Sequence, residues 1–357
     1  MNQKNIKQLT IVQVIIILFL VYYLPQFQFS ALQKVSKAEQ QPQSQTNLLK
    51  IQNQQQKKLA SETNLKLNTD KNQNKSKTNQ KDQMTSQATR LPSLFISHGL
   101  VGETLNPDTQ LFKCLNKYTK DNKLQSRIKT AIIISGHWEE KQVTVNLNPH
   151  PKVVHDHPSK WLYKFNFSLD TNVELAKQIH QKLLDNKIQA KTTTSEDIDH
   201  GGWGGLFCLY DINEQQKAFQ SNTKYAPQIV QVSLHSGMDT AFHYKIGQIL
   251  EQFRDENTII INSGASTHSF TYMNHPQFTA WSKEWEKYLI EIVTNKDEQK
   301  RRDAIVAIKQ HKMYNYMHHS DDHFMPLLVA LGTSKYPGEL ICLEQQFTFM
   351  CSCYSFQ

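Results

Sequence analysis

The sequence predicts one α/β domain with a central, mostly parallel or mixed sheet flanked by helices. Apolar runs rich in isoleucine, such as 132–134 and 259–261, are typical of strands buried on both faces. These runs alternate along the chain with segments of helical periodicity, the pattern of α/β folds. Several runs also end in small residues followed by a histidine. Because ligand-binding groups gather beyond the carboxyl ends of strands in open α/β sheets, we expect a metal site at that edge.

The predicted elements follow one another in the order strand, helix, strand over most of the chain after residue 91. Val, Ile and aromatic residues in short apolar or alternating runs predict strands at 93–97, 131–135, 143–147, 188–193, 228–234 and 258–262, and a last strand ending at Tyr354. Apolar residues at helical spacing predict helices at 108–120, 172–186, 243–254, 277–293 and 324–331.

The composition divides the 357 residues into three parts, and all 15 histidines, five tryptophans and five cysteines lie after residue 91. We expect an apolar signal peptide or signal anchor at 1–31, a disordered Gln/Lys/Asn-rich linker at 32–90, and a catalytic domain at 91–357. The first 91 residues carry 13 Lys and Arg against four Asp and Glu. The positive net charge of the chain therefore comes from this leading part and not from the predicted domain. For this reason no nucleic-acid partner is expected.

The apolar segment 10–24 follows Lys4 and Lys7 and precedes Pro25. Positively charged residues followed by a short apolar run are typical of a cleaved secretory signal peptide or of an uncleaved signal anchor. We therefore expect a membrane-associated or secretory protein tethered through 10–24, with the side of the membrane that the domain faces left open. The five cysteines form no C-x-x-C pair, so neither a disulfide framework nor a thiolate zinc site is expected. The sequence does not indicate the oligomeric state.

Histidines follow three of the predicted strands. His98 comes directly after the first strand, His137 follows the run 132–134, and His268 lies four residues beyond Gly264. A single histidine after a strand is more often a structural residue. Three in one predicted sheet favour one metal site at its edge, because imidazole is a common ligand of zinc and iron.

Two further segments place histidines in unusual surroundings. His200 lies in the run 199–205, which holds four glycines and Trp203; glycines let the backbone approach a ligand closely, although a structural turn explains them equally well. His323 lies in 318–326, where Asp321 and Asp322 fit either a helix start or a carboxylate that completes an iron site.

Taken together, these segments resemble the class III extradiol ring-cleavage dioxygenases, in particular the DOPA-dioxygenase-like branch. The five matching pieces, in order, are 97–99 (Ser-His-Gly), 135–139 (Ser-Gly-His-Trp-Glu), 199–203 (Asp-His-Gly-x-Trp), 263–268 (Ser-Gly-x-x-Thr-His) and 322–327 (Asp-His-Phe-x-Pro-Leu). The resemblance implies that His98, His137 and His323 hold one Fe(II) or Zn(II) ion per chain. It also implies that His268 is a fourth metal contact or the acid/base, and that His200 lines the substrate pocket as a catalytic residue.

The resemblance implies that the chain opens the ring of a small catechol, such as a DOPA-like compound, with O2. The chain departs from the family at Leu100 and Val101, where a small residue and proline are usual, and at Ser269, where asparagine is common. The segment 155–158 (His-Asp-His-Pro) matches an aromatic-Asp stretch only loosely. These departures bear on the substrate more than on the metal.

Two other functions remain open from the sequence alone. Three histidines and a water molecule are a common catalytic zinc arrangement, so a zinc-dependent hydrolase is one alternative. A catechol-binding protein without turnover is the other, and the changed residues Leu100 and Val101 are its only support.

Overall fold

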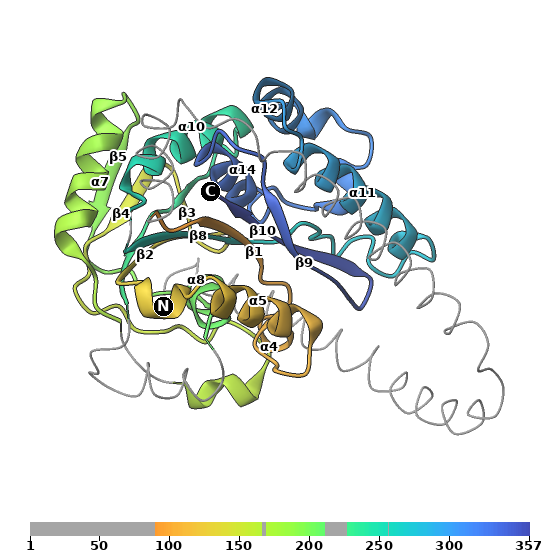
Figure 1. Ribbon diagram of the computed structural model, residues 1–357, viewed down its shortest axis with the longest axis horizontal. Coiled ribbons are helices and arrows are strands. Elements are labelled where there is room, and N and C mark those ends of the chain that lie inside the picture. The colour runs from red at the N-terminus through yellow and green to blue at the C-terminus, as the bar shows by residue number, and fades with distance from the viewer. Residues whose placement is uncertain (1–89, 166–168, 211–226, 256) are drawn as a thin grey trace, which may run out of the picture. The chain divides into compact units, whose positions relative to one another are not determined.

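The computed structural model describes residues 90–165, 169–210, 227–255 and 257–357 (Figure 1). Its strands are β1 (Ser93–Ser97), β2 (Thr130–Ser135), β3 (Glu139–Glu140), β4 (Val143–Asn146), β5 (Ala190–Thr193), β6 (Gln228–Gln231), β7 (Leu234–His235), β8 (Thr258–Gly264), β9 (Glu339–Gln346) and β10 (Phe349–Phe356). Its helices are α4 (Val101–Thr104), α5 (Gln110–Asp121), α6 (Leu124–Arg127), α7 (Val173–Asp185), α8 (His200–Phe207), α10 (Thr240–Leu250), α11 (Phe278–Val293), α12 (Glu298–Val306), α13 (Tyr314–Met317) and α14 (Met325–Gly332). Three short 3-10 helices lie at Lys160–Lys164, Glu251–Phe253 and Ile308–Gln310.

The predicted α/β class is confirmed. Six strands form one sheet in the order β6-β2-β8-β1-β10-β9, in which the first four are parallel, β10 runs antiparallel to β1, and β9 runs antiparallel to β10. Two further sheets of two strands each, β3-β7 and β4-β5, lie outside this sheet.

Both faces of the sheet are covered, which explains the uninterrupted isoleucine runs. Along β2, Ile132 and Ile134 enter one apolar cluster, while Ile133 enters the cluster on the other face. Helices α7, α10, α11 and α14 pack on the first face, and α4, α5 and α8 pack on the second (Figure 1). Side chains alternate between the faces of a strand, so a strand buried on both sides must be apolar throughout.

Several predicted elements differ from those observed. The strand predicted at 228–234 ends at Gln231, and the chain then moves to β7 in a separate sheet. The glycine-rich segment considered as a turn is helix α8, whose capping residue Asp199 accepts a hydrogen bond from the Gly202 amide. Strand β9 and helix α12 were not predicted, because β9 is interrupted by charged and amide residues and α12 has no apolar stripe.

One prediction about the cysteines is wrong. Cys114 of α5 and Cys342 of β9 form a disulfide across 228 residues of sequence. Neighbouring contacts support the same packing: both carboxylate oxygens of Glu344 accept hydrogen bonds from the first amides of α5, Gln110 and Leu111. The bond joins elements that are distant in sequence, so cysteine spacing could not reveal it.

The prediction of a membrane-associated or secretory localisation is also wrong. Among the described ranges, which begin at residue 90, no helix has the length and apolar character needed to cross a membrane. The segment 10–24, together with the predicted signal at 1–31 and nearly all of the linker at 32–90, lies outside the described residues.

A buried glutamate on α11 makes the stability of the fold depend on pH. Glu286 is 1 % exposed and accepts a hydrogen bond from the Tyr354 hydroxyl, 2.9 Å away. Burial raises the pKa of Glu286, so the folded chain holds this proton at pH values where the unfolded chain, with a glutamate pKa of about 4.3, has lost it. Stability is therefore full at low pH and falls as pH rises toward the pKa of the folded state.

We expect Glu286→Gln to be more stable than the parent above about pH 5, because the amide keeps the acceptor for Tyr354 and has no proton to lose. Chemical denaturation across a pH series measures the difference, which grows by up to about 1.4 kcal/mol per pH unit. Glu284→Gln, at an exposed position of the same helix, is the control and is expected to follow the parent. A constant difference between Glu286→Gln and the parent at every pH would contradict the account.

Candidate active site

The carboxyl ends of three neighbouring strands meet at one edge of the sheet. Ser97 at the end of β1 pairs with Gly264 of β8, and Ser135 at the end of β2 pairs with Ser263. His98 follows β1 directly and His137 follows β2 by two residues. The register of the parallel strands therefore brings these two histidines to the same edge, as the sequence predicted.

His323 reaches this edge from the turn that precedes α14. The amide of Ala265 donates to the carbonyl of His323, 2.8 Å away, and so attaches the turn to the end of β8. Two glycines make room for it: a Cβ on Gly264 would collide with the His323 carbonyl, and one on Gly136 would lie 3.1 Å from the His323 Cα. The small residues after the strands therefore serve close backbone packing.

His98, His137 and His323 form a group whose ring nitrogens converge. The Nε2 atom of His137 lies 3.3 Å from Nε2 of His98 and 3.1 Å from Nε2 of His323. Two nitrogens that each lie about 2.1 Å from one ion at a tetrahedral angle are about 3.4 Å apart. The spacing of these imidazoles thus fits a shared transition-metal ion. The resemblance implied this three-histidine group as the metal ligands, with His268 as a possible fourth contact.

The other nitrogen of each ring faces a different partner. His98 Nδ1 lies 3.0 Å from Ser263 Oγ, and His323 Nδ1 lies 2.8 Å from Asp322 Oδ2. Such contacts hold a ligating imidazole in one tautomer, with Nε2 available for a metal ion. Burial, with repulsion from His323 and His137, lowers the pKa of His98 well below its usual value, so His98 is neutral and can donate its lone pair.

His200, predicted to be catalytic, lies beside the three-histidine group as the first residue of α8. Its ring centroid is 4.1 Å from that of His137 and 5.7 Å from that of His98. The helix starts here because Asp199 caps it and also accepts a hydrogen bond from Ser135 Oγ, 2.6 Å away at the end of β2. This contact ties the position of His200 to the strand that carries His137.

Sequence reasoning missed Asp156, which bonds to His200. Its Oδ1 atom lies 2.7 Å from His200 Nδ1, and its Oδ2 atom lies 3.9 Å from His137 Nδ1. Burial alone would raise the pKa of Asp156, but hydrogen bonding and charge interaction with His200 lower it to about 2, so the carboxylate is ionised. The only signal was the loose match of 155–158 to an aromatic-Asp stretch.

His268 is close to the three-histidine group but does not converge with all of it. Its ring stacks on that of His323, with centroids 3.7 Å apart and planes at 19°, and its ligand atom lies within 4.8 Å of those of His323 and Asp322. Burial, followed by repulsion from His323, lowers the pKa of His268 far below its usual value. A ring stacked face to face on His323 fits a base beside the metal site better than a fourth ligand, and both roles stay predictions.

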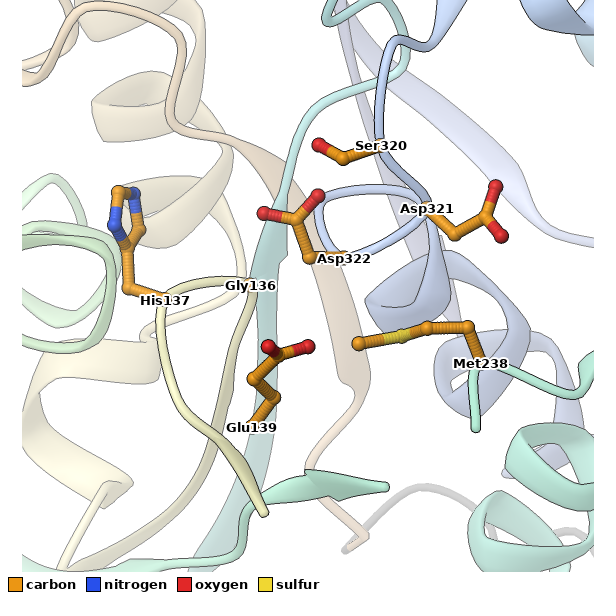
Figure 2. A pocket seen from close by; sticks show the side chains of 7 residues that line it. All are labelled: Gly136, His137, Glu139, Met238, Ser320, Asp321 and Asp322. Atoms are coloured by element: carbon orange, nitrogen blue, oxygen red, sulfur yellow. The ribbon is translucent and has the colours of Figure 1, made fainter. Parts of the chain in front are cut away.

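A pocket of about 360 Å³ opens beside His137 and Asp322, and Gly136, Glu139, Met238, Ser320 and Asp321 complete its lining (Figure 2). In Figure 2 the side chains of Glu139 and Met238 extend toward each other below Asp322, while the carboxylate of Asp321 is turned away. Asp321 accepts hydrogen bonds from Lys309 and Tyr314 instead. The volume lies within the range of about 300–1,000 Å³ typical of small-molecule sites.

We expect Gly264→Ala to disturb the metal site without touching a ligand. The added methyl group would collide with the backbone carbonyl of His323 and push this ring away from its partners. Overpacking of this kind costs about 1–3 kcal/mol of stability. Displacement of a ligand should lower metal affinity by about 10–100-fold, the effect of losing groups that orient ligands.

Metal titration of the purified variant and thermal denaturation measure the two effects of Gly264→Ala. Gly237→Ala is the matched control, because a Cβ there meets only the side chain of His235, which can move. Parent-like metal affinity in Gly264→Ala would show that this glycine does not position His323.

The family profile described as "Catalytic LigB subunit of aromatic ring-opening dioxygenase" matches residues 90–350. A relative from Beta vulgaris named "4,5-DOPA dioxygenase extradiol" is 27% identical over 248 residues, which are 68% of this chain and 86% of the relative. A protein of the same name from Escherichia coli is 23% identical over 261 residues, 69% of this chain and 86% of that one.

A solved structure supports the fold independently. The crystal structure of the uncharacterized protein JW3007 from Escherichia coli K12 superposes with a TM-score of 0.56, covering 75% of this chain and 100% of that chain at 19% sequence identity. At this level of identity the likeness concerns the fold alone.

Proposed function

Because this chain belongs to the LigB family of aromatic ring-opening dioxygenases, in its DOPA-dioxygenase-like branch, and is an extradiol ring-cleavage dioxygenase, we propose that its substrate is a small DOPA-like catechol. O2 is the proposed co-substrate, and one Fe(II) or Zn(II) ion held by His98, His137 and His323 is the proposed cofactor. The convergence of three Nε2 atoms at one edge of the sheet carries this proposal.

The residues present suit such an ion. Three imidazoles are a common ligand set for catalytic Zn(II), and imidazole also suits iron. When bound, Fe(II) would lower the pKa of the catechol hydroxyls that coordinate it and let electrons pass from the substrate to O2. His98, His137 and His323 would hold the ion through Nε2, while Ser263 and Asp322 contact Nδ1 of His98 and of His323 and orient these two rings.

The remaining residues of the site handle protons and shape the pocket. His200 lies against the rings of His98 and His137, where it can accept a proton from a hydroxyl of the substrate and return it later. His268 stacks on His323 and is the second candidate for this role. The pocket beside His137 and Asp322 offers space for a substrate next to the three-histidine group.

The family assignment is evidence against the two other functions considered from the sequence, a zinc-dependent hydrolase and a catechol-binding protein without turnover. The changed residues Leu100 and Val101 have a structural role here, since Leu100 precedes α4 and Val101 is its first residue and packs in the core.

Metal analysis and an oxygen electrode test the proposed function. Protein purified without oxygen and loaded with Fe(II) is expected to consume one O2 per catechol ring, and ¹⁸O₂ should place both atoms in the product. NMR of the product should show the bond beside the two hydroxyl carbons broken. A dihydroxybenzene with non-adjacent hydroxyls is the negative control. Fully loaded protein that consumes no oxygen with any of a panel of catechols would contradict the proposal.

A further inference from the structure

Asp156 lies between two histidines to which the proposed function gives different tasks. Its Oδ1 atom contacts His200 twice, at 2.7 Å from Nδ1 and 3.1 Å from the backbone nitrogen. Its Oδ2 atom lies 3.9 Å from Nδ1 of His137, beyond hydrogen-bond distance. Asp156 therefore acts on His200 by direct hydrogen bonds and on His137 through charge.

The contact with Asp156 decides which nitrogen of His200 carries a hydrogen. Asp156 Oδ1 already accepts the backbone N–H of His200, and a carboxylate oxygen is an acceptor, so the short contact to the ring requires a hydrogen on Nδ1 of His200. In the neutral ring, Nε2 then has a free lone pair. The backbone hydrogen bond from His200 to the same oxygen holds the start of α8 in place and restricts the orientation of the ring.

The loop that carries Asp156 is itself held at several points. The Tyr163 hydroxyl donates to the carbonyls of His155 and His157 on either side of Asp156, at 3.3 and 3.1 Å. Trp203 Nε1 donates to the Val154 carbonyl, 3.0 Å away. Because Trp203 and His200 belong to the same helix, α8 and this loop are fixed relative to each other, and Asp156 is pre-positioned to meet His200.

We propose that Asp156 is a positioning residue that holds His200 in its Nδ1–H tautomer, so that the free Nε2 accepts the proton that the substrate hydroxyl loses. In that step the O–H bond of the catechol breaks and an N–H bond forms at His200 Nε2, while the Asp156 carboxylate stabilises the resulting positive ring. That the proton comes from a catechol hydroxyl rests on the proposed function, whereas the assignment of the Nδ1–H tautomer to His200 does not.

Nitrogen NMR measures the tautomer directly. We propose long-range ¹H–¹⁵N correlation spectra of the full chain loaded with Zn(II) and labelled with ¹⁵N-histidine, in which the His200 signals are assigned by their loss in His200→Gln. The parent is expected to show hydrogen on Nδ1 of His200. Asp156→Ala should show a mixture or the Nε2–H form, whereas Asp156→Asn keeps an acceptor oxygen and should retain the Nδ1–H form.

Turnover and metal content are measured on the same variants. Asp156→Ala is expected to lower kcat by about 10²-fold, the lower range of general acid–base catalysis, with one metal ion per chain retained. The matched control is Asp170→Ala, since Asp170 makes the same contact to a histidine, 2.8 Å from His150 Nδ1, with both side chains 70% exposed and outside the site. It should leave kcat and the His200 signals unchanged.

Three results would overturn the proposal: an Nε2–H tautomer of His200 in the parent, unchanged His200 signals in Asp156→Ala, or parental turnover by Asp156→Ala. The proposed function fails separately. If no catechol is turned over while the tautomer depends on Asp156, the positioning role stands without the proposed reaction. If catechol is cleaved at parental rate by Asp156→Ala, the reaction stands and Asp156 has no part in it.

Discussion

His98→Gln is expected to lose the bound metal ion and, with it, all turnover of catechols. His98 is 1 % exposed and contacts both His137 and Ser263. A glutamine side chain fills most of the same space, but its amide is a much weaker metal ligand than imidazole. Metal content measured on purified protein should fall from one ion per chain to near zero. Oxygen uptake should fall to the level of chelator-treated parent protein.

His137→Gln and His323→Gln should give the same result, because each of the three rings offers one ligand atom within 4.8 Å of the other two. His150→Gln is the control, since this ring is exposed and bonds only to Asp170 in the part of the chain that the structure describes. Circular dichroism shows whether each variant is folded. A folded His98→Gln protein that retains one tightly bound ion per chain would mean that the metal lies elsewhere.

The second large effect is expected for His200→Gln, which should keep the metal and lose most of its rate. Its ring lies beside the three-histidine group, but Nδ1 is engaged with Asp156, so we expect His200 to contribute through proton transfer rather than through metal binding. General acid–base groups contribute about 10²–10⁴-fold, and kcat should fall within that range. KM should change by less than about threefold, because the effect falls on the transition state.

His268→Gln, measured beside it, separates the two candidates for the base. The residue whose loss lowers kcat while metal stoichiometry is kept is the one that moves the proton. His180→Gln is the control, because this ring lies on α7, and among the described residues its hydrogen-bond partner is the Ala190 carbonyl of β5. Loss of metal in His200→Gln would make this residue a ligand, and parental kcat would leave it without a catalytic role.

The sheet and the histidines that follow its strands were predictable because local sequence determines them. Isoleucine runs mark β2 and β8, and the predicted bounds of β1, 93–97, are those observed. Parallel strands end at one edge, so His98 and His137 had to lie at the same edge once β1 and β2 were placed on either side of β8. Their approach to His323 was implied by the resemblance and not by strand order.

Helix α8 shows where local reasoning fails. Four glycines weaken a helix in isolation, and the segment reads equally well as a turn. In the structure they allow close packing on the sheet: a Cβ on Gly205 would lie 2.9 Å from Ser263 Oγ, and one on Gly201 would lie 2.6 Å from Ser135 Oγ. This requirement comes from tertiary contacts that the sequence does not display.

The roles of Asp156 and His268 were difficult to predict for a related reason. The path of a loop decides which residues each of these side chains contacts. Asp156 is 44 residues from His200 in sequence, and only the fold of the loop anchored by Tyr163 brings them together. His268 lies on a segment that pairs with residues 317–319, and this pairing turns its ring onto His323. Residue type alone could not separate a ligand from a stacked base.

The most direct test of the metal site is a crystal structure of the Fe(II)-loaded chain with anomalous diffraction data at the iron absorption edge. The account predicts one anomalous peak per chain, about 2.1 Å from Nε2 of each of His98, His137 and His323. A peak held instead by His137, Asp156 and His200, or by His268, Asp322 and His323, would contradict it, because these are the other two groups whose ligand atoms lie close enough to share an ion among the described residues.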